Sequence, residues 1–166
     1  MTELIEKAKA EELFMRRGHL FHPGQLHGIG EVTVLYIGAE VYYTGCTVSQ
    51  FCKQLIKAFL IDEELVRRFA YETLGQRKHP PLLLHPEMVL IPFHYPLFGN
   101  PSHRTVYTYR SSIETYTVNA DNLSCTLLLK GGQSFALTAS RRQLTRQLRN
   151  AEHLRNRYLM RLPDLT

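Results

Sequence analysis

A basic segment near the end of the chain holds the residues whose types and spacing suggest chemistry most directly. The stretch SRRQLTRQLRNAEHLRNRYLMR, residues 140–161, contains seven arginines and a single glutamate. A guanidinium group is planar and always charged, and it donates paired hydrogen bonds to the oxygens of phosphates and carboxylates. The chemistry expected of this segment is therefore recognition of an anion.

The spacing of these residues predicts an amphipathic helix that begins after an N-cap at Ser140 and stops near Pro163. At about 100° per residue, one stripe is apolar, with Leu154 at its margin, and comprises Leu144, Leu148, Ala151, Tyr158 and Leu162. The opposite side, about 80° wide, is basic and comprises Arg142, Arg146, Arg149, His153 and Arg157. Arg155 falls on the apolar side, where we expect it to mark fraying or a turn end.

Sorting of charge on this scale favours an anionic partner. Like charges four residues apart on a helix cost a few tenths of a kcal/mol, and a helix that is merely soluble usually mixes both signs. Some helices with one basic face nevertheless bind nothing anionic, so a solvated face stays open as the alternative interpretation.

The rest of the chain contains no pattern typical of an enzyme. His19, His22 and His27 have no cysteine or carboxylate at a metal-ligand spacing, and we interpret them as loop histidines. Neither a nucleophile motif nor a phosphate-binding loop is present, so we expect no catalysis, metal or cofactor. Three cysteines without paired spacing are interpreted as small buried apolar residues: Cys46, Cys52 and Cys125.

Length and composition predict an ordinary folded protein. The chain has 166 residues, of which 44% are hydrophobic and 21% charged, and we expect one domain over residues 1–166. A formal net charge of +5 and a pI near 9.2 permit binding to nucleic acid or to an anionic membrane. The first residues do not resemble a secretory signal and no apolar run could cross a bilayer, so we expect a cytoplasmic protein that is not in a membrane.

The elements that must position the basic helix predict an α+β fold. The N-terminal half is expected to contain helical segments, with an extra helix over residues 1–17 and a longer helical stretch over 47–75. Between them, residues 31–46 predict a hairpin around Gly38. The apolar stripes expected in the second helical stretch are Val48, Phe51, Leu55 and Phe59, followed by Leu65 and Phe69.

An antiparallel sheet is expected after residues 75–80, where the helical period gives way to alternation. Proline-marked apolar runs predict strands in LLL and MVLIPF. Four further strands are expected in TVYTYR, IETYTVN, SCTLLL and QSFALT, with a tight turn at residues 130–133. Tyrosines in these strands and in the hairpin are expected to pack rather than to stack on bases.

Residues 77–86, RKHPPLLLHP, begin a resemblance to the ComK family, the competence transcription factors of Gram-positive bacteria. A strand like VLIPF, a loop like NPSHR, a hairpin like CTLLLKGGQSFALT and a basic helix up to HLR follow in the family's order. Upstream, Gln54–Gly75 is similar to the family's basic helical segment and includes Phe59, Arg67, Arg68, Tyr71 and Glu72. The resemblance covers roughly residues 30–155. It departs from the family where LVRR replaces a glycine–arginine step and where the chain has no tryptophan after the proline loop.

The resemblance implies a sequence-specific transcriptional activator of competence-type genes that works as an oligomer. It also implies association with the nucleoid, readout of A/T-rich boxes largely through the minor groove, and control of the protein's level by an adaptor and a protease. A narrow A-tract groove attracts inserted arginine, which is compatible with this chain's composition. The expected contacts to double-stranded DNA are Arg67, Arg68, Arg77, Lys78 and Arg104 from the resemblance, and Arg142, Arg146, Arg149 and Arg157 from the helical sorting.

Two alternative functions remain open on the sequence. The order of strands, hairpin and amphipathic helix also resembles a LytTR-type response-regulator domain, which would place loops between strands in the major groove. The other alternative is a non-catalytic interaction module whose basic helix binds an acidic protein or an anionic surface. Salt titration against duplex DNA and against anionic vesicles separates the last alternative from the first two.

Overall fold

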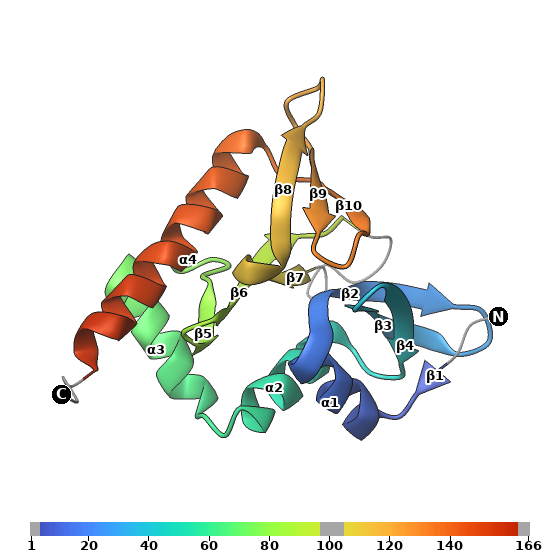
Figure 1. Ribbon diagram of the computed structural model, residues 1–166. Coiled ribbons are helices and arrows are strands. Elements are labelled where there is room, and N and C mark those ends of the chain that lie inside the picture. The colour runs from blue at the N-terminus through green and yellow to red at the C-terminus, as the bar shows by residue number, and fades with distance from the viewer. Residues whose placement is uncertain (1–3, 97–104, 163–166) are drawn as a thin grey trace.

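The computed structural model describes residues 4–96 and 105–162, and it has the expected α+β arrangement (Figure 1). The helices in these ranges are α1 Lys7–Arg17, α2 Val48–Ala58, α3 Glu63–Leu74 and α4 Arg141–Arg161. The strands are β1 Leu4–Ile5, β2 Gly18–Leu26, β3 Gly30–Ile37, β4 Glu40–Thr44, β5 Leu82–His85, β6 Met88–His94, β7 Thr105–Tyr109, β8 Ile113–Val118, β9 Cys125–Leu129 and β10 Ser134–Leu137. A short 3-10 turn, η2 Arg110–Ser112, links β7 to β8.

The strands form two sheets. Seven strands lie in the order β1-β4-β3-β2-β7-β6-β5 and three in the order β10-β9-β8. All pairs between the described strands are antiparallel except β1 with β4. Because Leu20 and Phe21 of β2 pair with Thr108 and Tyr107 of β7, one sheet runs across the point near residues 75–80 where the sequence pattern changes.

Two groups of buried side chains lie on the two sides of the structure. One joins α1 and α2 to the large sheet through edge-to-face contacts among Phe14, Phe21 and Phe51. The other lies beneath α4 and the small sheet, and Leu144 and Leu127 belong to it. In Figure 1, α4 runs along one flank of the molecule, next to α3 and away from α1. No described helix combines the length and apolar character needed to span a bilayer.

The N-terminal segment differs from the expected helix over residues 1–17. β1 precedes α1, and β2 starts directly at Gly18, where the helix ends. The interpretation of His19 and His22 as loop residues is therefore wrong, because both lie in β2. The sequence pattern did not predict this strand, because Pro23 was read as a break. The proline is tolerated because the pairing of β2 with β7 is confined to residues 20–21, and among the described residues the stretch that contains Pro23 pairs with β3 alone.

The helical stretch expected over 47–75 is two helices. Thr47 caps α2 and Asp62 caps α3, while Leu60 between them has a left-handed backbone with φ of 60°. The first predicted stripe is buried at Val48, Phe51 and Leu55, with Phe59 partly buried at the C-cap. The second is displaced: Val66 and Ala70 are buried, Phe69 is partly buried and Leu65 is 57% exposed.

The remaining strand predictions are confirmed. The 31–46 hairpin is β3–β4, and the four alternating runs are β7 to β10. Residues 130–133 form the tight turn of the β9–β10 hairpin, closed by the Leu129 N–H donating to the Gln133 carbonyl at 2.9 Å. All three cysteines are buried free thiols, as expected.

Candidate nucleic-acid interface

The basic helix is built as its sequence predicts at its start. The Ser140 hydroxyl accepts from the Gln143 N–H at 3.2 Å, and the Gln143 side chain accepts from the Ser140 N–H at 2.8 Å, so two orphan amides of the first turn are satisfied. Helical residues continue to Arg161. At about 1.5 Å per residue, the helix is roughly 30 Å long.

The buried face of α4 is turned relative to the predicted stripe. The buried residues are Leu144, Gln147, Ala151 and Leu154. Leu148 and Tyr158 are only partly buried, and Leu162 is 48% exposed. The stripe therefore sits about 40° from its expected position, with Leu154 inside it rather than at its margin. A polar residue, Gln147, occupies a position that the hydrophobic pattern could not assign to the core.

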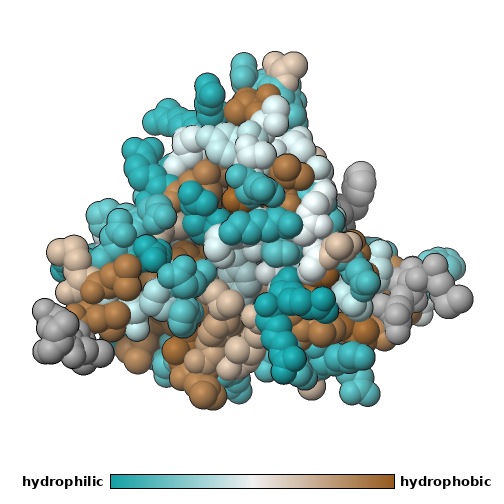
Figure 2. Space-filling model, in the orientation of Figure 1, coloured by the Kyte–Doolittle hydropathy of each residue, from teal (hydrophilic) through white to brown (hydrophobic). Residues whose placement is uncertain are grey.

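The predicted basic face remains exposed although the buried stripe is displaced. Arg142, Arg146, Arg149 and Arg157 are all exposed. Within residues 4–96 and 105–162, no ion pair involves any of the four. Figure 2 shows hydrophilic side chains following the outer side of α4. From Arg142 to Arg157 the face extends about 22 Å along the helix axis, comparable with six base-pair steps of duplex DNA.

Arg155 has a structural role, which corrects the expectation that it marks fraying or a turn end. Its Nε donates to the Pro86 carbonyl at 2.9 Å, and its guanidinium pairs with Glu87 at 3.1 Å. Both partners lie in the turn between β5 and β6. Arg155 thus ties the helix to the large sheet and is not part of the free basic face.

A network of amides joins α4 to the loop after α3. Gln147 Nε2 donates to the carbonyls of His79 and Pro92, each at 2.8 Å. Gln76 Nε2 donates to Gln147 Oε1 at 3.0 Å, and Asn150 Nδ2 donates to Gln76 Oε1 at 2.8 Å. These contacts hold the loop of residues 76–79 against the central turns of α4.

This loop brings two more predicted contact residues beside the helix. Arg77 and Lys78 follow Gln76 directly, and both are exposed. Arg77 lies over the Tyr71 ring, with its guanidinium carbon 5.7 Å from the ring centroid. His79 follows them in the loop. Its pKa is lowered mainly by partial burial of the imidazole, and further by the positive charges of His94 and Lys78. The imidazole of His79 is therefore neutral at physiological pH, and the charge of the loop comes from Arg77 and Lys78.

The two predicted arginines of α3 differ from those of α4 because both have acidic partners. Arg67 pairs with Glu63 at 2.9 Å and Arg68 pairs with Glu64 at 3.1 Å, each four residues apart on the same helix. Their side chains remain 45% and 54% exposed. Exposed pairs of this kind are worth only about 0.3–0.5 kcal/mol, so a phosphate could replace the carboxylate at little cost.

The structure thus places the α4 arginines and the Arg77–Lys78 pair on neighbouring elements, and the Arg67–Arg68 pair on α3, which also packs against α4. Arg104 lies outside the described residues. The amides of Gln76, Gln147 and Asn150 were missed by sequence reasoning. The sequence contained one indication of this network. On the helical projection Gln147 lies among Leu144, Ala151 and Leu154, which predicts a buried amide that needs hydrogen-bond partners.

Metal binding finds no support in the described part of the chain, where no three histidine, cysteine or acidic side chains come together. His19 Nδ1 instead lies 2.8 Å from the Ser112 hydroxyl, and His22 Nδ1 donates a hydrogen bond to the Pro23 carbonyl at 2.7 Å.

Comparison of the chain with family models, with curated proteins and with solved structures finds no match.

Proposed function

We propose that this chain is a sequence-specific DNA-binding transcriptional regulator, a ComK-like activator of competence-type genes that acts on the nucleoid in the cytoplasm. Its basic helix α4 contacts the DNA backbone, and arginines elsewhere in the chain read A/T-rich boxes largely through the minor groove. We assign it no catalytic step. The protein works as an oligomer, and an adaptor with a protease controls its level.

One observation carries the proposal. Four exposed arginines lie on one face of a helix whose other face is buried, and no carboxylate among the described residues neutralises them. A rigid helix presents these charges without the entropy cost of ordering a flexible arm. The spacing of successive phosphates along a duplex supplies negative charge over the same length.

The packing of α4 disfavours an anionic membrane as the partner. A helix that binds at a lipid surface inserts an apolar face among the acyl chains. In α4 that face is occupied, because Leu144, Ala151 and Leu154 are buried in the protein. Leu159 and Met160 are exposed in the last turn, but from Arg142 to Arg157 the exposed side carries no large apolar residue, which suits a polyanion better than a bilayer.

Two predicted contacts can act together with α4. Arg77 and Lys78 are held beside its central turns by the Gln76 and Gln147 amides. Phosphate contacts fix position along the duplex, and base contacts fix sequence. We assign the α4 arginines and Lys78 to phosphates. Arginines outside this set enter the minor groove and read the A/T boxes.

The proposal is tested by fluorescence anisotropy with two duplexes of equal length, one with paired A-tract and T-tract boxes and one G·C-rich. The boxed duplex is expected to bind at least about tenfold more tightly at moderate salt, a difference of about 1.4 kcal/mol. Equal affinity for both duplexes would contradict sequence-specific readout. Vesicles with anionic lipid serve as the third ligand, and tighter binding to vesicles than to either duplex would favour the interaction-module alternative.

A further inference from the structure

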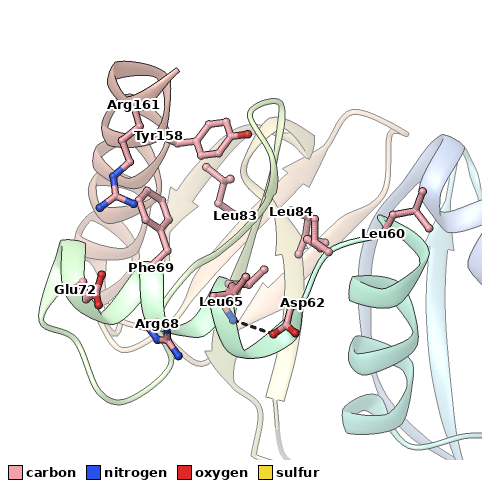
Figure 3. A pocket seen from close by; sticks show the side chains of 12 residues that line it. Leu60, Asp62, Leu65, Arg68, Phe69, Glu72, Leu83, Leu84, Tyr158 and Arg161 are labelled. Atoms are coloured by element: carbon pink, nitrogen blue, oxygen red, sulfur yellow. Dashed lines mark hydrogen bonds between the residues drawn. The ribbon is translucent and has the colours of Figure 1, made fainter. Parts of the chain in front are cut away.

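A groove separate from the basic face opens between α3, the C-terminal end of α4 and β5 (Figure 3). Its volume is about 790 Å³. Leu83 and Leu84 of β5 form the floor, and Phe69 of α3 and Tyr158 of α4 approach each other at one end. The lining is mostly apolar. Figure 2 shows hydrophobic side chains toward the C-terminal end of α4 and around the connection between α2 and α3.

Leu60 stands at the other end of this groove (Figure 3). Its side chain is 93% exposed, and its backbone has a φ of 60°, a conformation that leucine rarely adopts. A large apolar side chain is thus held in water next to an apolar hollow. A small-molecule ligand in the groove would give no reason for a projecting leucine beside it, whereas a protein surface with a matching hollow would.

The charges at the edge of the groove have both signs. Asp62 and Glu72 are acidic, and Arg68 and Arg161 are basic. Arg161 is oriented by the Phe69 ring, with the guanidinium carbon 5.0 Å from the ring centroid. A two-fold contact places the same surface on both sides, so it must be complementary to itself. An edge with acid and base in equal number meets that condition, and a partner of one charge sign does not match it.

We propose that this groove is the contact surface between two copies of the chain related by a two-fold axis, with Leu60 of each copy inserted into the groove of the other. Acidic and basic residues at the edges of the two grooves then face each other. The contact gives the proposed oligomer a defined surface. It requires no DNA, so its test is independent of the DNA-binding proposal.

In such a dimer, α4 contributes both to the groove and to the basic face. Arg161 lies at the groove, and Arg157 of the basic face lies one helical turn before it. The two basic helices therefore approach each other at the dimer contact, and each chain carries a formal net charge of +5. Added salt screens both this repulsion and the attraction between the acidic and basic edges, so the apolar contact is expected to persist at high salt, whereas DNA binding weakens.

The test is sedimentation equilibrium of the full chain without DNA, at several protein concentrations and at low and high salt. Leu60→Asp introduces a charge at the centre of the proposed contact, and aspartate tolerates the left-handed backbone better than leucine does. Leu123→Asp is the matched control, because Leu123 is 70% exposed in the connection between β8 and β9. Leu60→Asn repeats the test without a change of charge.

The expected result is a monomer–dimer equilibrium that persists at high salt. Leu60→Asp and Leu60→Asn raise its dissociation constant at least about tenfold, which corresponds to about 1.4 kcal/mol. Leu123→Asp changes it less than about twofold. Thermal unfolding confirms that each variant is folded. A parent chain that stays monomeric at about 100 μM, or a dimer that Leu60→Asp and Leu123→Asp weaken equally, would overturn the proposal.

Discussion

Replacement of Gln147 by methionine tests whether the amide network holds the Arg77–Lys78 loop against α4. Gln147 is 3% exposed and makes three hydrogen bonds, to the His79 and Pro92 carbonyls and from Gln76. Methionine keeps the length of the side chain and removes its donor and acceptor. The change therefore isolates the hydrogen bonds from the packing volume.

The magnitude follows from the partners that lose a bond. A buried hydrogen bond contributes about 1 kcal/mol net, so loss of three predicts a fall of about 3 kcal/mol in the free energy of unfolding. The His79 carbonyl keeps a bond from Gln76 Nε2 at 2.9 Å, which limits the loss on that side. For a chain of this length, about 3 kcal/mol corresponds to roughly 6–12 °C in Tm.

The assay is urea and thermal unfolding of Gln147→Met beside Arg146→Met, a neighbouring exposed position. The control is expected to change the free energy of unfolding by less than about 0.5 kcal/mol. Trypsin cleavage after Arg77 and Lys78, which are exposed in the loop, should quicken in Gln147→Met alone. Equal stability of the two variants, or unchanged cleavage in the loop, would refute the role assigned to Gln147.

Three further outcomes are expected. A Cβ at Gly18 would lie 2.3 Å from the Phe14 ring, so Gly18→Ala should cost about 1–3 kcal/mol of unfolding free energy, whereas Gly45→Ala should cost under about 0.5 kcal/mol in the same urea titration. Burial, opposed by the hydrogen bond to Pro23, lowers the pKa of His22, so the folded state binds this proton less tightly than the unfolded state. The associated stability is full above about pH 6.5 and is lost as pH falls through the folded pKa, and His22→Gln should flatten that decline. Burial raises the pKa of the Cys52 thiol to about 11, so maleimide at pH 8 should label it in urea and not in the native protein.

The sequence predicted those elements whose periodicity is uninterrupted. The β3–β4 hairpin, the β9–β10 turn and the capped start of α4 follow from alternation, glycine placement and the Ser140–Gln143 pair. β2 was missed because Pro23 suggests a break. Within the described part of the chain, the proline is accommodated in a stretch of β2 that pairs on one side only, and no local pattern reveals that condition.

The candidate site was partly predictable for a similar reason. Helical projection placed Arg142, Arg146 and Arg149 on one exposed side, since a helix fixes the angles between its residues. The core-facing direction of α4 depends on contacts from distant segments, above all the carbonyls of His79 and Pro92 that Gln147 satisfies. Those contacts displaced the buried stripe, and hydrophobicity alone could not have shown it.

The most direct test of the central claim is the salt dependence of DNA binding. Log affinity is measured against log salt concentration for the parent chain, for Arg142→Ala, Arg146→Ala, Arg149→Ala and Arg157→Ala singly and for the four combined. Arg16→Ala on α1 is the control, because the Arg16 side chain is 73% exposed on a helix that lies away from α4 (Figure 1). Each single α4 change should lower the slope by about 0.9 and the combined variant by about 3.6, with folding nearly unchanged and no effect of Arg16→Ala. A combined variant that keeps the parental slope would show that the basic face of α4 meets only water.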